Sequence, residues 1–458
     1  MRLLAKTIML LSLFVVGSIV SAQEPTLPVK VSENGRYFVD QNAKPIFWLG
    51  TTQWELFHGF TQDEAKRIID KSKSAGFSVI QVMLTGVGDG TKPNVYGQKP
   101  WLTNDPLTPN EAYFKNVDSV LQMVGDENLI VVVTVYHQTL RKFITAEKAR
   151  RWAKWVGHRY RNVPNIVWSL VPEAKESYLP ITRDLAVGLR EGDGGNHLIT
   201  VHPDPSPYSS SFLHTEDWLD FNTIQTWNAV KLIYPMVTYD YNLKPIKPVV
   251  MAEGAYEAGT EYSFDVTPLW VRRQAYYSYL AGGYHAYGHN DSWRVPLLPT
   301  WKQALDAPAV AQMSVLKKTF LARNQWWFMV PDQSLFESGG RISDAQLPIE
   351  IKTDKERSAY VRGLGPYVTG GKPGPNELLH LAARHKDGQW AMLYLADNAS
   401  FSVNLSKLIA PKLNLFWVNP ITGEPTPIGQ EPNTGVKSFT TPEGWEDSIL
   451  ILEAAKSL

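Results

Sequence analysis

The sequence predicts an α/β protein in which a (β/α)8 TIM barrel, residues 28–365, precedes a small antiparallel β-sandwich, residues 376–456. Two observations carry this prediction. Strand-like and helix-like segments alternate between residues 45 and 320, which is the order of a parallel sheet covered by helices. From about residue 376 the chain changes to short strands separated by turns, which is typical of a sandwich. A chain of 458 residues is long enough for both domains.

Eight short apolar segments are the expected barrel strands. The segment 130–136, Ile-Val-Val-Val-Thr-Val-Tyr, has no polar alternation, as expected of a parallel strand buried on both faces. In chain order, the expected strands are residues 45–50, 78–84, 129–136, 166–170, 198–202, 221–225, 249–252 and 283–288.

Helix signals lie between several of these strands. Thr61 and Glu64 form a capping box at the start of the first helix, and Gly76 is placed to end it. Thr267 before Pro268 predicts the start of a helix that runs to about residue 281. Other helices are expected at 111–127, at 146–160 and up to residue 320, whereas helices are poorly marked between 217 and 240.

The C-terminal segment predicts a sandwich from its turns. Asp387-Gly388 is a strong hairpin signal, and residues 420–423, Pro-Ile-Thr-Gly, form another turn. A stretch rich in Gly and Pro, residues 363–375, is the expected connection to the barrel. The expected sandwich strands are residues 378–385, 390–395, 401–405, 414–419 and 448–453.

The N-terminus has the pattern of a signal peptide, residues 1–22. Arg2 and Lys6 supply positive charge, residues 8–20 are apolar, and Val20-Ser-Ala22 is a small-residue cleavage site. Thirteen residues are short for a membrane span, although an uncleaved anchor is the alternative. We therefore expect a secreted or periplasmic protein, cleaved near Ala22, with no membrane span in the mature chain.

Composition excludes several other classes. The chain has no cysteine, which excludes disulfides, thiolate metal sites, a cysteine nucleophile and a lipid anchor on cysteine. Cleavage would remove two of 45 basic side chains and none of 45 acidic ones, which leaves a net charge of −2. Such a balance gives no electrostatic reason to expect a nucleic acid partner.

Two carboxylates follow expected strands and predict the chemistry. Glu173 comes after the fourth strand and Glu253 after the seventh. The carboxyl ends of barrel strands share one rim, which carries the active site in this architecture. Cleavage of a glycosidic bond with retention requires two such acids, one as nucleophile and one as acid/base. The sequence therefore predicts a glycosidase in which Glu253 is the nucleophile and Glu173 the acid/base.

Less specific roles remain open for both acids. Glu253 could instead form a structural salt bridge at the mouth of the barrel. Glu173 could lie at the rim without transferring a proton, and Glu176 could take its place. Many barrels of this kind have Asn before the acid, whereas this chain has Pro172.

Aromatic and polar residues near the expected rim suggest a sugar site, because sugar C–H faces stack on aromatic rings. The candidate substrate-binding residues are Trp54, His137, Gln138, Gln225, Trp227, Tyr287, His289 and Trp293. Three rim histidines, His137, His202 and His289, could instead hold a metal, but no close ligand pair supports this. We expect no metal and no cofactor.

Several motifs together resemble the apiosidase-like family of bacterial glycoside hydrolases, glycoside hydrolase family 140. The matching stretches, each named by its ends, are Phe38-x-Asp40, Pro45 to Trp54, Asn165 to Trp168, Phe221 to Gln225, Pro248 to Gly254, Ala281 to His289 and Trp417 to Gly423. They cover most of the mature chain. The resemblance implies a (β/α)8 barrel followed by a small sandwich that is often labelled a collagen-binding domain.

The resemblance also implies a substrate and a mechanism. It implies cleavage of apiosyl linkages in pectin side chains with retention of configuration, Glu253 being the nucleophile. The family's fourth-strand motif typically ends in Gly-Gly-Asp, whereas this chain has Val171-Pro172-Glu173. This departure leaves a second hypothesis, a non-catalytic carbohydrate-binding protein on a degenerate barrel. A polysaccharide or oligosaccharide is the expected partner in either case, collagen binding by the sandwich is a weaker idea, and the oligomeric state is not indicated.

Overall fold

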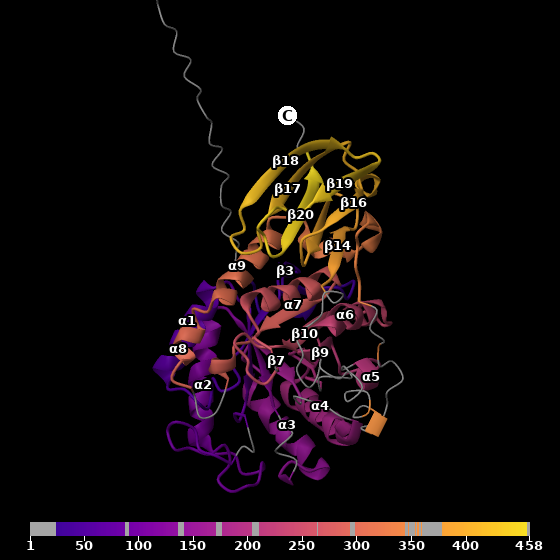
Figure 1. Ribbon diagram of the computed structural model, residues 1–458. Helices are drawn as coiled ribbons and strands as arrows, with labels where there is room; N and C mark the ends of the chain where they lie inside the picture. Colours follow the sequence, from indigo (N-terminus) through magenta and orange to yellow (C-terminus); the bar gives the residue numbers. More distant parts are fainter. Residues whose placement is uncertain are drawn as a thin grey trace, which may run out of the picture.

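The computed structural model describes residues 24–87, 91–135, 142–170, 176–203, 210–262, 264–293, 298–343 and 378–455, with isolated positions between 347 and 359. Figure 1 shows a barrel surrounded by helices and, beside it, a layer of C-terminal strands. The C-terminal strands lie against α7 (Pro268–Leu280) and α9 (Pro308–Leu321). The predicted fold class, a barrel followed by antiparallel sheets, is confirmed.

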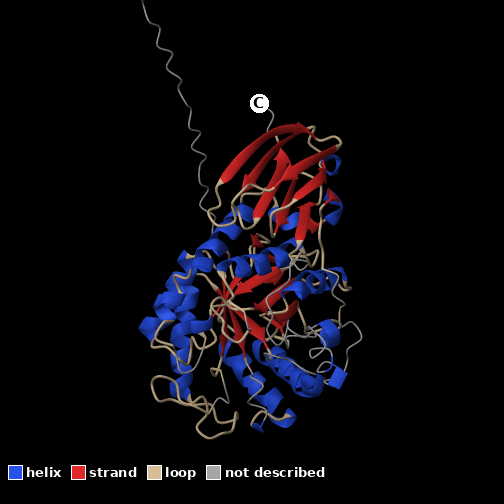
Figure 2. Cartoon of the chain, viewed as in Figure 1, coloured by secondary structure: helices blue, strands red, loops and turns tan. Residues whose placement is uncertain are grey.

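The barrel is an eight-stranded parallel sheet with the order β8-β7-β6-β5-β4-β11-β10-β9. The strands lie at the centre of a ring of helices (Figure 2). In chain order they are β4 (Leu49–Thr52), β5 (Val79–Met83), β6 (Ile130–Thr134), β7 (Ile166–Ser169), β8 (Ile199–Thr200), β9 (Asn222–Trp227), β10 (Val249–Gly254) and β11 (Tyr284–Tyr287). Each overlaps a segment that the sequence predicts as a strand.

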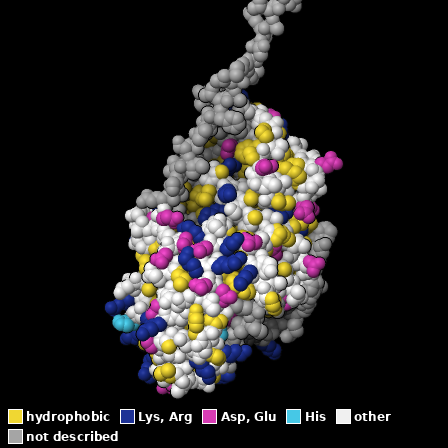
Figure 3. Space-filling model, turned by 90° about the vertical axis from the view of Figure 1, so that its left-hand side faces the viewer, with side chains coloured by type: hydrophobic (Ala, Val, Ile, Leu, Met, Phe, Trp, Pro, Cys, Tyr) yellow, Lys and Arg dark blue, Asp and Glu magenta, His cyan; other side chains and the backbone are white. Residues whose placement is uncertain are grey.

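The longer helices around the first half of the barrel are amphipathic and their polar sides face solvent, whereas α7 is buried along most of its length. On the side drawn in Figure 3, acidic and basic side chains are mixed across this layer. None of the helices in the described ranges is long and apolar enough to span a membrane. Besides α7 and α9 they are α1 (Gln62–Ser74), α2 (Glu111–Asp126), α3 (Ala146–Tyr160), α4 (Leu179–Asp193), α5 (Ser210–Leu213), α6 (Ile233–Asn242) and α8 (Trp301–Ala304).

The first of these helices has the ends that the sequence predicts. The Thr61 side chain accepts a hydrogen bond from the Glu64 backbone, and the Glu64 side chain accepts one from the Thr61 backbone, which is a capping box. Gly76 follows the last turn with a φ of 86°, a left-handed conformation that glycine adopts without strain. The capping motif and the glycine therefore fix both ends of α1.

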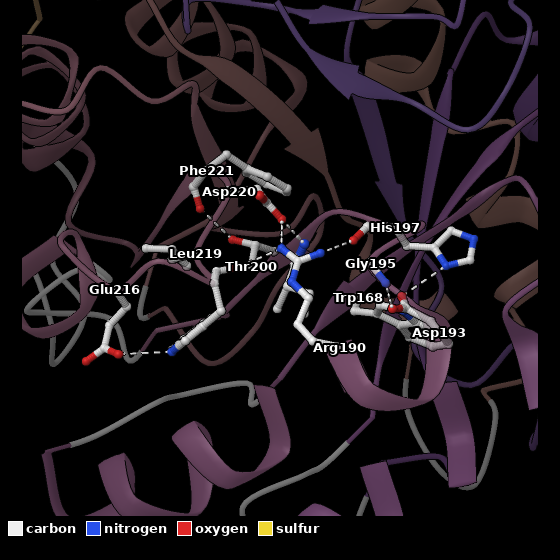
Figure 4. A network of polar contacts seen from close by, with 12 residues as sticks. Trp168, Arg190, Asp193, Gly195, His197, Thr200, Glu216, Leu219, Asp220 and Phe221 are labelled. Carbon is white, nitrogen blue, oxygen red and sulfur yellow. Dashed lines mark hydrogen bonds and ion pairs between the residues drawn. The ribbon is translucent and has the colours of Figure 1, made fainter. Parts of the chain in front are cut away.

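Polar contacts close the barrel between its two edge strands, β8 and β9 (Figure 4). The Asp220 backbone donates to the Ile199 carbonyl at 2.9 Å, and Thr200 Oγ1 donates to the Phe221 carbonyl at 2.8 Å. The Asp220 carboxylate accepts from Ile199 N at 2.6 Å and from Arg190 Nη2 at 2.7 Å. Side chains thus supply hydrogen bonds at the seam where the short strand β8 offers few backbone partners.

Helices α3 and α4 approach each other through glycine. A Cβ atom on Gly188 would lie 2.3 Å from the Arg150 carbonyl oxygen, and one on Gly192 would lie 2.3 Å from the Lys154 carbonyl oxygen. No real side chain tolerates such distances, so both positions require glycine. The two helices therefore pack backbone to backbone on the outside of β7.

A small three-stranded antiparallel sheet precedes the barrel, made of β1 (Lys30–Val31), β2 (Phe38–Val39) and β3 (Pro45–Ile46). The single strand predicted at 45–50 is therefore divided. Its first part pairs with β2, and its last part is the start of β4. Trp48 lies between the two parts. Its ring centroid is 4.3 Å from that of Phe38 and 5.5 Å from that of Phe221. These rings fill the amino-terminal end of the barrel.

The C-terminal domain consists of a six-stranded and a three-stranded antiparallel sheet. The larger sheet, in spatial order, contains β12 (Met329–Pro331), β14 (His380–His385), β15 (Trp390–Leu395), β20 (Ser448–Ala454), β17 (Lys412–Val418) and β18 (Pro425–Pro432). The smaller sheet contains β13 (Phe336–Ser338), β16 (Ser400–Asn404) and β19 (Val436–Thr440). The Asp387-Gly388 turn joins β14 to β15 as an antiparallel hairpin, as predicted.

The sequence does not predict four strands of the sandwich. β12 and β13 lie within 28–365, the range expected for the barrel, yet they pair with β14 and β16. β18 contains Pro425, Pro427 and Pro432, and proline argues against a central strand. The structure explains these prolines, because β18 is the outermost strand of its sheet. β19 is mostly exposed and lacks the apolar alternation that marks a strand.

Helix α7 is buried between the barrel and the sandwich. Every residue from Trp270 to Leu280 is buried. The Tyr276 ring stacks on Tyr394 of the sandwich at 4.5 Å, and the Tyr277 hydroxyl accepts from the backbone of Leu379 at 2.9 Å. The two domains therefore share one continuous core along this helix.

Asp240 on α6 is a fully buried carboxyl. Ser210 Oγ donates to its Oδ1, whereas its Oδ2 has no hydrogen-bond partner among the residues that the structure describes. Burial raises the pKa of Asp240 from 3.8 to about 8. The uncharged form therefore predominates at neutral pH.

Replacing Asp240 with Asn is expected to remove part of the pH dependence of stability. Because the folded-state pKa lies above the ordinary one, the carboxyl contributes most stability below about pH 4 and loses it as the pH rises to about 8. The loss amounts to about 1.4 kcal/mol per pH unit in that range. Urea unfolding of wild type and Asp240→Asn at pH 5, 6 and 7 measures it. Parallel pH profiles would contradict the expected protonation.

Candidate active site

Glu253 lies at the carboxyl end of β10, at a local irregularity of the sheet. The pairing of β10 with β9 shifts register on both sides of Glu253, which pairs with Gln225, while Gly254 pairs with Trp227. Such a bulge changes the direction of a side chain at a strand end. The expected strand 249–252 therefore continues to Gly254, and Glu253 is part of it.

Two donors from β9 hold one oxygen of the Glu253 carboxylate. Gln225 Nε2 donates to Oε1 at 3.0 Å, and the indole N–H of Trp227 donates to the same oxygen at 3.2 Å. Both neighbours are among the residues that the sequence predicts for the site. Oε1 is therefore fixed by protein groups, and 14% of the Glu253 side chain remains exposed.

Trp227 holds this position in a strained conformation. Its φ is 49°, in the left-handed region that bulky side chains rarely occupy. Strain of this kind costs about 1–3 kcal/mol and is typical of functional sites. Here the unusual conformation lies at the end of β9, where the indole reaches Glu253.

His202 and Tyr256 are two further neighbours of the Glu253 carboxylate. His202 Nε2 is 3.4 Å from Oε2, a distance compatible with an ion pair but long for a hydrogen bond. Tyr256 Oη accepts from the indole N–H of Trp54 at 3.0 Å. Because that indole can only donate, the hydroxyl proton of Tyr256 is free to be donated to Glu253, with which it also interacts. Burial, and then the charge of Glu253, raise the pKa of the Tyr256 hydroxyl.

Gly288 makes room for Tyr256. A Cβ atom at position 288 would lie 2.3 Å from the Tyr256 ring, so any other residue would displace the ring. Trp54 also packs edge-on against His202, with 5.6 Å between ring centroids. Trp54, predicted as a sugar-binding residue, is thus buried and positions Tyr256 and His202.

Sequence reasoning does not identify Tyr256, and it considers His202 only as a metal ligand. In the sequence only their positions mark them: Tyr256 follows Glu253 by three residues, and His202 lies at the end of the fifth barrel strand. Neither position forms a motif by itself. Glu257, one residue beyond Tyr256, belongs to a different environment.

Tyr287 contacts Glu257. The Tyr287 hydroxyl donates to Glu257 Oε2 at 2.6 Å, and the backbone of Ala309 donates to Oε1 at 3.2 Å. Burial raises the pKa of Glu257. The Tyr287 ring stacks on Phe77 at 5.8 Å. Tyr287, expected to bind substrate, is therefore buried in the barrel wall, and no contact among the described residues joins it to Glu253.

The remaining candidates are only partly described. The Trp293 ring lies 6.2 Å from Tyr256 in an edge-on arrangement, so Trp293 is brought to the site. His289 Nδ1 accepts from the Asp291 backbone at 3.1 Å, and burial lowers the pKa of His289. Glu173, His137 and Gln138 lie outside the described residues.

Polar groups inside the barrel support the strand that carries Glu253. Gln81 Nε2 donates to the Ala252 carbonyl at 3.0 Å and to Thr52 Oγ1 at 3.0 Å, which ties β5 to β10 and β4. Gln225 Oε1 is buried and has no hydrogen-bond partner within the described part of the chain. The side chain that orients Glu253 thus has its amide oxygen enclosed beside the carboxylate. Within the described part, no cluster of His, Asp and Glu is suited to a metal ion.

The site lies in a stretch that matches a known family. Residues 32–327 match the model of the apiosidase-like catalytic domain. The chain belongs to the apiosidase-like family. Residues 369–453 match a second model, described as a "Putative collagen-binding domain of a collagenase". Together the two matches cover the barrel and most of the sandwich of this apiosidase-like protein, and β12 and β13 lie between them.

Solved structures agree with the fold. A glycoside hydrolase superposes with a TM-score of 0.78 at 24% identity, covering 93% of this chain and 97% of its own. A glycoside hydrolase family 5 protein from Bacteroides vulgatus also has a TM-score of 0.78 and 24% identity, with 93% of both chains covered. No curated protein matches the sequence. With its apiosidase-like catalytic domain, the protein is a glycosidase that hydrolyses O-glycosyl bonds.

Proposed function

We propose that this apiosidase-like protein is a retaining glycosidase that removes side-chain sugars, apiosyl units in particular, from pectin-type plant cell-wall polysaccharides. The support for apiose is the family match, and the support for a retaining mechanism is the environment of Glu253. The predicted signal peptide suits a secreted or periplasmic enzyme that meets polysaccharide outside the cytoplasm.

One observation carries the mechanism: two protein donors hold Oε1 of Glu253, whereas Oε2 lies 3.4 Å from His202 Nε2. Gln225 and Trp227 bind Oε1, which stabilises the negative charge and fixes the plane of the carboxylate. Oε2 is then the oxygen that attacks the anomeric carbon. The attack forms a glycosyl-enzyme and expels the leaving-group oxygen.

Glu173 is the proposed acid/base. It would protonate the leaving oxygen in the first step and deprotonate water in the second, at about 5–5.5 Å from the nucleophile. Glu173→Ala should therefore spare activity on substrates whose leaving group needs no proton. Total loss on such substrates by a folded variant would argue against this role.

The proposal is tested by sugar release from plant polysaccharides and aryl glycosides, apiosides included. Proton NMR of the first product identifies its anomeric configuration. Release of apiose with the starting configuration is the expected result. Inversion would overturn the retaining mechanism, and release of a different sugar would overturn the apiose assignment.

The altered motif Val171-Pro172-Glu173 motivates a second candidate, a barrel that binds carbohydrate without cleaving it. Oligosaccharide binding by a folded protein that releases no sugar from any substrate would favour this candidate. Retention on immobilised collagen, measured in the same preparation, tests the collagen-binding label of the sandwich separately.

A further inference from the structure

A groove runs between the barrel and the sandwich, remote in sequence from the residues around Glu253. One wall is α9, and the other is formed by β17 and β18 with the turn that joins them. Its volume is about 730 Å³, within the range of ligand pockets. The lining residues named below belong to these elements, to β20, or to the two positions that directly follow α9, Ala322 and Arg323.

The groove exists because the sandwich sheet continues beyond the helix on which it packs. β14 and β15 pack on α7, whereas β18 is the outermost strand and its residues are largely exposed. The turn after β17 meets α9 at one point, where a Cβ on Gly423 would be 3.2 Å from Val315. Between that contact and β20, no other element of the described chain covers the face of β17 and β18 that lines the groove with α9.

Arg323 is the most informative side chain of the groove. It is 90% buried, and its Nε and Nη1 have no hydrogen-bond partner among the described residues. Its nearest counter-charge is Glu453, at 3.4 Å from Nη1. A buried guanidinium with unbonded N–H groups is costly to a fold, which suggests that a ligand supplies acceptors.

Beside Arg323 the groove offers flat apolar surfaces and amides. The guanidinium lies 5.4 Å from the centroid of the Phe416 ring, and the rings of Pro425 and Pro427 continue the surface along β18. Asn414 and Gln430, bonded to each other at 2.8 Å, present amide groups beside it. Rings next to amides and a guanidinium suit sugar, whose units have apolar C–H faces and hydroxyl edges.

The charges of the groove favour an anion. Lys318 is exposed on α9 and adds a second positive charge, while Glu453 is the single acidic residue of the lining. The lining therefore carries a net charge of +1 before a ligand binds. Arginine binds carboxylates with paired hydrogen bonds, which gives an acidic ligand a defined orientation.

We propose that this groove binds an acidic polysaccharide, a chain of uronate-type sugars, at a site separate from Glu253. Sugar rings lie on Phe416 and the two prolines, and a carboxylate meets Arg323 and Lys318. The inference goes beyond the proposed activity and does not depend on it. The role of the groove is to hold the protein on an acidic polymer.

Binding is measured with Glu253→Gln as the parent, so that no substrate is consumed. Polygalacturonate is the acidic probe and galactan the neutral one, each in affinity electrophoresis and calorimetry. We expect binding of polygalacturonate that weakens with added salt, and much weaker binding of galactan. Because this binding measurement requires no turnover, its result can be interpreted even if the wild-type protein hydrolyses no substrate.

Three variants locate the site. Ala322 is exposed directly after the last residue of α9 and lines the groove, so Ala322→Trp fills it without touching the core. Arg323→Met and Lys318→Glu remove the positive charges. Each should weaken polygalacturonate binding at least tenfold. Lys407→Glu, the matched control, changes an exposed charge of the sandwich that does not line the groove and should change affinity less than twofold.

Several outcomes overturn the proposal. Unchanged binding by Ala322→Trp and Lys318→Glu, both surface positions, would move the site elsewhere even if Arg323→Met failed to fold. Absence of binding, equal binding of galactan, or retention on collagen without retention on polygalacturonate would each exclude an acidic polysaccharide. A wild-type dimer that Ala322→Trp converts to monomer would assign the groove to a second copy of the chain.

Discussion

Glu253→Gln is expected to lower kcat/KM by about 10⁴–10⁶-fold, the range found when an enzyme loses its nucleophile. The amide keeps the size of the side chain and can still accept from Gln225 and Trp227. It cannot attack the anomeric carbon. Steady-state kinetics on the best substrate of the panel measure the loss, with a thermal melt to show that the variant is folded.

Glu257→Gln is the matched control, because it makes the same change four residues further along the chain. Glu257 is bonded to Tyr287 and to the backbone of Ala309. We expect its loss to lower the melting temperature while kcat/KM of the folded enzyme changes less than tenfold. Full activity in Glu253→Gln together with an inactive, folded Glu257→Gln would exchange the two roles.

A chemical rescue separates a nucleophile from a carboxylate that only supports the fold. Glu253→Ala leaves a space that azide can occupy, on the face from which Glu253 attacks. Added azide should then restore turnover and give a glycosyl azide of inverted configuration. The absence of rescue, with wild-type-like folding, would argue against covalent catalysis by this residue.

Arg272→Met is expected to destabilise the protein by about 3–5 kcal/mol, because it leaves a buried carboxylate without its partner. Arg272 on α7 donates from Nε and Nη2 to Asp447 of the sandwich at 3.0 and 2.7 Å. Each side chain is 1% exposed. The Tyr394 hydroxyl also donates to Asp447, at 2.7 Å. Urea unfolding of wild type and variant measures the change.

The double variant Arg272→Met/Asp447→Leu tests the cause. If the cost comes from the unpaired charge, removing the charge should recover a large part of it. Arg273→Met is the control: Arg273 donates to the Ala396 carbonyl at 2.7 Å, and its loss should cost about 1–3 kcal/mol. A double variant no more stable than Arg272→Met would assign the effect to packing instead.

The sequence predicts most of the barrel because its signals there are local. The capping box at Thr61, the glycine at 76 and continuous apolar runs specify α1 and the strands without knowledge of neighbours. The same reasoning misses α4, where tertiary packing dominates. Gly188 and Gly192 are unfavourable in an isolated helix, and only their close approach to α3 explains them.

The site is predicted less completely, for a physical reason. Glu253, Gln225 and Trp227 lie at ends of recognisable strands, and the structure brings them together. The position of Tyr256 depends on two residues far from it in the sequence. The Trp54 indole donates to its hydroxyl, and the missing side chain of Gly288 leaves room for its ring. For Tyr287 the sequence predicts a place at the sugar, whereas the contact that the structure shows is the hydrogen bond of its hydroxyl to Glu257.

The order of strands in the sandwich limits how this protein can be divided. β12 and β13 precede residue 339, whereas the sandwich match begins at residue 369. A fragment cut at that boundary would leave β14 and β16 each with an open edge, and unpaired edges template aggregation. The barrel fragment would keep two strands without a sheet. Recombination between relatives should therefore succeed at the end of α9, and a break after residue 339 should yield insoluble halves.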